Sequence, residues 1–115
     1  MAYYDIFLSP IADAKRGELE AFLEKSHAFL LDCGATQVVD LWGDDVPDGT
    51  LTSFPMAVKL EKGESVSAGW VTWPSKEVRD AGWAKMMADD SPDEMPFDGK
   101  RMMFAGFSEL LVSNG

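Results

Sequence analysis

The sequence is poor in the residue types on which most catalytic and metal-binding motifs depend. Its 115 residues include one cysteine, Cys33, and one histidine, His27. A single cysteine excludes an internal disulfide and fits a reducing compartment, so we expect a cytoplasmic protein. The two residues lie too far apart on one predicted helix to form a Cys–His pair. Glycine-rich nucleotide motifs, the metalloprotease helix motif and the Gly-x-Ser-x-Gly elbow are also absent from the sequence.

Basic residues are also scarce. Lysine and arginine number 10 against 20 aspartates and glutamates, which gives a formal net charge of -10 at pH 7. This balance argues against nucleic acid and against anionic membrane surfaces as partners. No uncharged run approaches the length of about 18 residues that a membrane span requires. Residues 1–10 lack a basic start and carry Asp5, so they do not resemble a signal peptide.

The composition is otherwise that of an ordinary globular domain. Hydrophobic residues make up 46% and charged residues 26% of the chain. No internal repeat, linker or low-complexity tract interrupts it, and its length is typical of one domain. We therefore expect a single domain over residues 1–115.

Hydrophobic periodicity predicts four strands and two principal helices. The apolar stripe of the first helix ends before Gly34, a favoured C-terminal cap, and Ser75 is a good N-cap for the second helix. An acidic loop with two prolines, residues 89–98, precedes the last strand. The expected strands span 2–8, 36–42, 65–73 and 100–112, the helices 16–32 and 76–88, and a short helical turn 54–58.

This order predicts an α+β fold of the ferredoxin-like βαββαβ type, an antiparallel sheet with two helices on one face. The third and fourth strands are apolar on both faces, whereas a solvated sheet face would alternate with polar residues. A second copy of the sheet is the expected cover, which predicts a homodimer.

Four linked segments resemble the DUF1428 family of unknown function. They are Gly43-Asp44-Asp45-Val46-Pro47, Ser53-Phe54-Pro55 with Ala57-Val58-Lys59, Trp73-Pro74-Ser75-Lys76 with Val78-Arg79-Asp80-Ala81, and Met95-Pro96-Phe97-Asp98-Gly99-Lys100-Arg101-Met102. The resemblance covers nearly the whole chain and implies a dimeric α/β barrel, in which two ferredoxin-like sheets close face to face. The resemblance does not indicate a particular reaction, and we predict no cofactor.

Few residues are candidates for a site. Asp5 stands among β-forming residues on the face of Tyr3 and Phe7. If that face lines the cavity between two sheets, Asp5 is a weak candidate for a buried catalytic acid; the alternative is a hydrogen bond to a neighbouring loop. Trp70 and Trp73 face opposite ways and could wall an apolar cavity, or belong to core and interface.

Lys100 and Arg101 are the candidates for an anionic ligand group. Alternation sends them to opposite sheet faces, and the bulk of Met103 and Phe107 favours the helix side for Arg101 and the cavity mouth for Lys100. The alternative is ion pairing with nearby acidic loops, Asp44 or Asp45 among them. Acidic loops and His27 are interpreted as structural, so no metal site is predicted.

Two hypotheses of different classes follow. In the first, a homodimer binds or transforms a small apolar, aromatic or anionic molecule in the cavity between its sheets. In the second, the protein is a non-catalytic dimeric interaction or structural module. The sequence leaves open whether the protein is an enzyme.

Overall fold

A computed structural model describes residues 1–88 and 95–115, so much of the predicted acidic loop 89–98 lies outside the described residues. The chain forms β1 (Tyr3–Ala12), a 3-10 turn (Asp13–Lys15), α1 (Arg16–Asp32), β2 (Gln37–Trp42), α2 (Phe54–Ala57), β3 (Glu64–Trp73), α3 (Lys76–Ala88) and β4 (Met103–Ser108). This is the predicted order of elements, and α1 has its predicted bounds.

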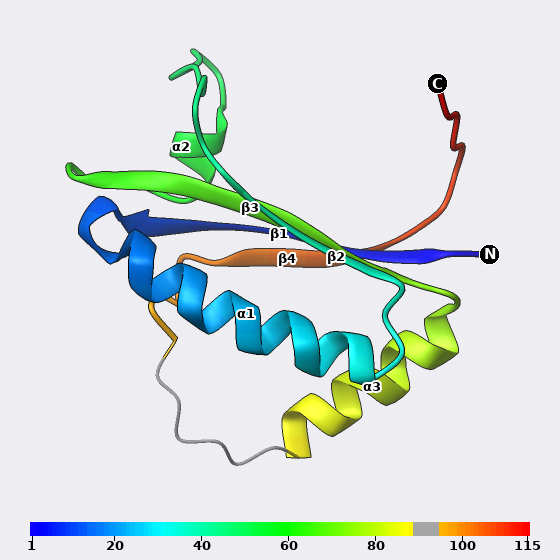
Figure 1. The fold of residues 1–115 in the computed structure, drawn as a ribbon. Coiled ribbons are helices and arrows are strands. Elements are labelled where there is room, and N and C mark those ends of the chain that lie inside the picture. The colour runs from blue at the N-terminus through cyan, green and yellow to red at the C-terminus, as the bar shows by residue number, and fades with distance from the viewer. Residues whose placement is uncertain (89–94) are drawn as a thin grey trace.

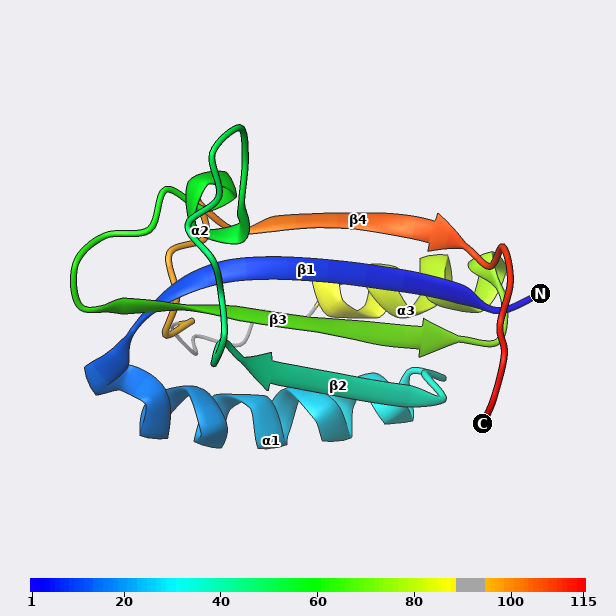
Figure 2. The same cartoon turned by 90° about the horizontal axis from the view of Figure 1, so that it is seen from above.

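The four strands form one antiparallel sheet in the order β2-β3-β1-β4, the ferredoxin-like arrangement. α1 and α3 lie together against one face of this sheet, while α2 stands on the opposite side (Figure 1). Viewed from above, α1 runs beneath the β2 edge, and β1 and β3 occupy the middle of the sheet (Figure 2). The predicted fold class is therefore confirmed.

Two predicted helix boundaries are explained by local structure, one by backbone conformation and the other by a hydrogen bond. Gly34 follows α1 with a φ of 111°, a left-handed conformation that glycine adopts without strain. At the start of α3, the backbone N–H of Val78 donates to Ser75 Oγ at 3.2 Å, which confirms Ser75 as the N-cap. The sequence therefore specifies both helix ends through cap residues.

The first strand is longer than predicted. Ser9 and Pro10 were expected to end it near Leu8, yet β1 continues to Ala12. β4 pairs with β1 only up to Leu8, so Pro10 has a strand neighbour on one side alone, opposite Val66 of β3. A proline that lacks an N–H is tolerated at such a one-sided position.

The last strand is shorter than predicted, and its faces are reversed. β4 begins at Met103, because Asp98 holds the preceding turn: its Oδ1 accepts the N–H of Lys100 at 3.0 Å. The register pairs Asp5 with Gly106 and Phe7 with Phe104, so these β4 residues face the helices. The prediction that Met103 and Phe107 form helix-side core is wrong, because Phe104 provides the inward aromatic ring.

The core lies between the sheet and the helices and centres on Trp73, Val71 and Ala35. Trp73 is fully buried. The other sheet face carries apolar side chains from all four strands, several of them half exposed: Ile6 (44%), Leu41 (49%), Met103 (45%) and Phe107 (50%). We call this surface the open face.

Candidate functional site

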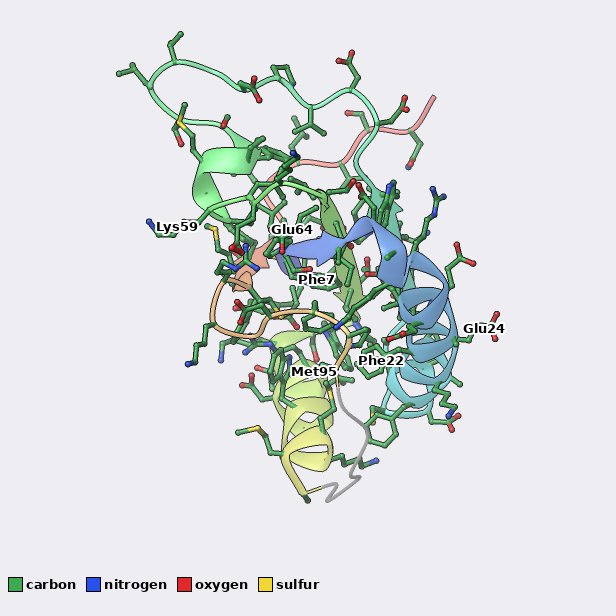
Figure 3. The ribbon with its side chains drawn as sticks, turned by 90° about the vertical axis from the view of Figure 1, so that its left-hand side faces the viewer. Phe7, Phe22, Glu24, Lys59, Glu64 and Met95 are labelled. Carbon is green, nitrogen blue, oxygen red and sulfur yellow. The ribbon has the colours of Figure 1, made fainter. Side chains whose placement is uncertain are left out.

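An apolar cavity of about 530 Å³ separates the sheet from the two long helices. We call it the chamber. Figure 3 shows Phe7, Phe22 and Met95 in the space between the sheet and the helices, while Glu24 points outward from α1. The aromatic part of its wall comprises Phe7, Phe22, Trp83, Phe97 and Phe104, and the methionine part comprises Met86, Met87, Met95 and Met102. Unbranched methionine side chains give such a wall an adaptable shape.

Aromatic contacts hold parts of this wall in place. The rings of Trp83 and Phe104 stack with centroids 5.4 Å apart, which joins α3 to β4. Phe97 meets Phe22 of α1 edge to face at 5.9 Å. Both geometries are favourable for aromatic pairs, so the segment before β4 is anchored against α1 beside the chamber.

One polar pair interrupts the apolar wall. Nε2 of His27, on α1, lies 2.6 Å from Oδ2 of Asp40, on β2. The two side chains are 31% and 11% exposed respectively, and both residues line the chamber. They are the only titratable side chains among the described lining residues, which also include Ser9, Ser26 and Ser67.

Gly69 leaves the space that Asp40 occupies. It lies opposite Asp40 in the β2–β3 register. A Cβ atom at Gly69 would lie 2.8 Å from Cε2 of Phe7 and 3.0 Å from Oδ1 of Asp40, and would also collide with the carbonyl oxygen of Val39. The missing side chain therefore lets the chamber wall and the carboxylate approach β3 closely.

A second carboxylate, Asp5, is buried beneath α3 at 2% exposure. Its Oδ2 accepts hydrogen bonds from the indole N–H groups of Trp73 and Trp83, both at 2.9 Å. The other carboxylate oxygen of Asp5, Oδ1, accepts hydrogen bonds from Arg79 Nε at 3.1 Å and from Arg79 Nη2 at 2.8 Å. This pairing raises the pKa of Arg79 above its usual range.

The surroundings of Asp5 make it a structural anchor. The guanidinium of Arg79 neutralises its charge and lies between the rings of Tyr3 and Trp83, 5.3 Å from each centroid. Asp5 faces the helices, not a space between two sheets, and its hydrogen bonds come from α3 and β3, not from a loop.

The two tryptophan candidates, Trp70 and Trp73, lie on opposite faces of the sheet. Trp73 is core: its indole packs where a side chain at Gly82 of α3 would collide, and it does not line the chamber. Trp70 lies on the open face, with its Nε1 3.4 Å from Oε1 of Gln37. The wall residue of the chamber is instead Trp83.

Arg101 is bound by acidic side chains. Its Nη1 and Nη2 each donate to Glu64 at 2.8 Å, its Nε donates to Asp98 at 2.9 Å, and Nη1 also reaches the carbonyl oxygen of Lys59 at 3.1 Å. Glu61 adds an ion pair at 3.3 Å. The guanidinium therefore lowers the pKa of Glu64 and of Asp98.

The anion-site hypothesis does not fit this geometry. The carboxylates that bind Arg101 are Glu61, Glu64 and Asp98, not Asp44 or Asp45. Lys100 is an exposed turn residue ahead of β4, so strand alternation does not place it at a cavity mouth. Neither residue lines the chamber.

The sequence analysis missed the His27–Asp40 pair, although a signal was present. His27 lies on the flank of the apolar stripe of α1, and Asp40 interrupts β2 on the same side as Val38 and Trp42. A charged residue inside a strand, facing a helix that carries the lone histidine, is the pattern that would have indicated it. Within residues 1–88 and 95–115, no group of three His, Cys, Asp or Glu side chains is arranged to hold a metal ion.

Fold and site together define an α+β protein with a ferredoxin-like antiparallel sheet and an apolar chamber between its sheet and its helices. The chain belongs to the DUF1428 family, described as a protein of unknown function, whose model matches residues 2–99. None of the described helices combines the length and apolarity needed to cross a membrane.

Similar proteins align with this chain over nearly their full length. The uncharacterized protein YbaA of Escherichia coli (strain K12) is 42% identical over 115 residues, covering 96% of this chain and 98% of YbaA. YbaA of Shigella flexneri has the same identity and coverage. A crystal structure of a MhuD mutant with two manganese protoporphyrin IX molecules bound per active site has a TM-score of 0.61 at 15% identity, covering 98% of this chain and 99% of MhuD. That likeness is one of fold.

Proposed function

We propose that the chamber binds a small, neutral, apolar or aromatic molecule. The observation that carries this proposal is an apolar cavity of about 530 Å³ with one polar pair in its wall. Small-molecule sites have volumes of about 300–1,000 Å³, apolar linings and a few polar groups that orient the ligand. The chamber combines all three features within one protomer, on the helix side of the sheet rather than between two sheets.

The charge of the lining favours a neutral ligand. The described lining residues include Asp40 but no lysine or arginine. A permanently anionic ligand would lose its hydration and meet a carboxylate, and no lysine or arginine among the described lining residues would compensate its charge, which is costly in an apolar site. The same argument distinguishes this chamber from a site for protoporphyrin IX, the bound group in the MhuD structure, because that molecule carries two carboxylates.

Binding of a neutral probe tests the proposal. We expect 2-methoxynaphthalene to bind the purified protein by isothermal titration calorimetry and to raise its Tm, while 2-naphthoate and haem do not. Ser26 lines the chamber and Ala28 is exposed on the same helix. Ser26→Trp should fill the chamber and abolish binding, while the matched control Ala28→Trp should retain it.

Two results would contradict the proposal. One is equal binding by the Ser26→Trp and Ala28→Trp variants, which would place the probe elsewhere. The other is the absence of binding by any neutral aromatic probe of this size, which would favour the non-catalytic interaction module.

We also propose that two copies pair through their open faces. Half-exposed apolar side chains from β1, β2 and β4 make this surface unlike a solvated sheet face, which would carry polar residues. The polar atoms of Tyr4 and Trp70 form hydrogen bonds within the chain. The Tyr4 hydroxyl donates to Glu109 at 3.0 Å, and the Trp70 indole N–H donates to Gln37. The face that remains is apolar and suits a self-complementary two-fold contact.

Light scattering at micromolar concentration tests the pairing. The wild-type protein should have about twice the mass of one chain. Ile6→Lys places a charge in the centre of the open face and should give monomer or unfolded protein, whereas Ala28→Lys, on the outer side of α1, should leave the mass unchanged. A wild-type protein that is a stable, cooperatively folded monomer would contradict the proposal.

A further inference from the structure

The pairing of His27 with Asp40 fixes the chemistry of the histidine ring. A carboxylate only accepts hydrogen bonds, so a distance of 2.6 Å between Nε2 and Oδ2 places the imidazole proton on Nε2. The neutral ring then keeps a free electron pair on Nδ1. The carboxylate holds the ring in this orientation through Nε2 and leaves Nδ1 as the hydrogen-bond acceptor.

The chamber provides such a base with few competitors. Along the wall, α3 contributes Trp83, Met86 and Met87, and β3 contributes Ser67, none of them charged. A neighbouring hollow shares Asp40 and Ser67 with the chamber and is also lined by Arg16 and Glu20, whose side chains pair with each other at 3.5 Å. Glu24, one turn before His27 on α1, points to solvent (Figure 3).

We propose that His27 and Asp40 accept a proton from a chamber ligand that carries a weakly acidic aromatic hydroxyl group. This inference rests on the proposed function of the chamber. A phenol or naphthol enters neutral, as a described lining without lysine or arginine favours, and donates a hydrogen bond to Nδ1 of His27. It is the ligand class that uses both the apolar volume and the polar pair.

The proton transfer balances without a co-reactant. The O–H bond of the ligand breaks, its electron pair remains on the oxygen, and a new N–H bond forms at Nδ1. The resulting naphtholate lies beside the imidazolium, which keeps its hydrogen bond to the Asp40 carboxylate through Nε2. His27 is thus the proton acceptor, and Asp40 is a positioning residue that acts through it.

The probe 4-nitro-1-naphthol tests this assignment, because its ionised form absorbs visible light. We expect the apolar wall to raise the pKa of the bound hydroxyl in wild type and in every variant. The informative comparison is therefore between the pKa of the probe bound to wild type and its pKa when bound to each variant. An adjacent cation lowers the pKa of an acid by about 1–3 units. We therefore expect His27→Gln to raise the pKa of the bound probe by about one unit or more, and Asp40→Asn to raise it by a smaller amount.

Two controls separate the base from the chamber. Ala28→Gln changes the exposed residue next to His27 on the outer side of α1 and should leave the pKa of the bound probe unchanged. The methyl ether of the probe, 1-methoxy-4-nitronaphthalene, has no acidic proton and should bind wild-type and His27→Gln proteins equally. Circular dichroism verifies that each variant is folded, and Asp40→Asn supplies an independent test of the pair.

The outcomes distinguish the two proposals. If both probes bind but the naphthol ionises at the same pH in wild type, His27→Gln and Asp40→Asn, the assignment of the base is wrong and the chamber proposal stands. If neither probe binds the wild-type protein, the proposed function fails and this inference fails with it.

Discussion

The indole N–H of Trp83 donates a 2.9 Å hydrogen bond to Oδ2 of the buried Asp5, which links a wall residue of the chamber to the centre of the sheet. A face of the same indole stacks on the ring of Phe104 of β4. Trp83 is therefore fixed by a polar and an aromatic contact at once. The position of α3, and with it one side of the chamber, depends on this residue.

Replacement of Trp83 should destabilise the protein in two steps. Trp83→Phe keeps a ring against Phe104 but removes the donor to Asp5, at a cost of about 1–3 kcal/mol in the free energy of unfolding. Trp83→Ala removes the ring as well and should cost about 3 kcal/mol or more. Urea denaturation measures both. A loss below about 0.5 kcal/mol for Trp83→Ala, the range of surface substitutions, would contradict the anchoring role.

Asp5→Asn should be more harmful than its conservative size suggests. The amide removes the negative charge that pairs with Arg79, and one of its two acceptor positions becomes an N–H donor that faces other donors. Breaking a buried ion pair in this way costs about 3–5 kcal/mol. Asp80→Asn, at an exposed carboxylate that also touches Arg79, is the control and should change the unfolding free energy much less. Equal effects would show that Asp5 is not the anchor.

Gly69→Ala should disturb the site through close contact. The added methyl group would press on Phe7 and Asp40, and such overpacking typically costs about 1–3 kcal/mol. Gly17→Ala provides a matched control, since nothing lies within 4 Å of its added carbon in α1. That variant should be neutral or more stable by about 0.4–1 kcal/mol. Thermal unfolding of the two variants tests the contrast, and an opposite order would contradict the geometry at Gly69.

The cluster around Arg101 should contribute a pH-dependent stability. Arg101 lowers the pKa of Glu64 from its usual value of 4.5, so the folded state binds the proton less readily than the unfolded state. The resulting stability is fully present above the unfolded pKa and is lost as the pH falls through the lowered folded pKa. Arg101→Met should lower the Tm at neutral pH and flatten this acid dependence.

Lys100→Met removes the same charge from the adjacent residue and is the control for Arg101→Met. It should leave both the Tm at neutral pH and its acid dependence close to those of wild type, because the side chain of Lys100 is exposed. A wild-type Tm profile in the Arg101→Met protein would show that the ion pairs with Glu64 and Asp98 do not stabilise the fold.

The fold could be predicted from the sequence because its determinants are local. Periodicity defined α1, Ser75 and Gly34 marked helix ends, and alternation in 65–73 assigned Trp70 and Trp73 to opposite faces. The predicted end of β1 was wrong because a strand that is distant in sequence determines it. Whether Pro10 ends β1 depends on how far β4 extends alongside it.

The site was harder to predict because its members come from separate elements. Asp5 was found as an unusual strand residue, but its role depends on Arg79 and Trp83, which only the packing of α3 brings to it. His27 and Asp40 each looked unremarkable alone, and their contact requires α1 to lie across β2. The size of the side chains could not predict which β4 residues face the helices, since both faces of this strand carry large side chains.

The most direct test of the chamber is an NMR titration of the protein labelled with ¹³C at its methionine methyl groups. The seven methionines include four that line the chamber, Met86, Met87, Met95 and Met102, while Met103 lies on the open face and Met1 and Met56 lie outside the chamber lining. On addition of 2-methoxynaphthalene, we expect shifts and intermolecular NOEs at Met86 and Met102, with Met1, Met56 and Met103 unchanged. Perturbation of Met103 alone, or of no methionine at saturating probe, would contradict a binding site between the sheet and the helices.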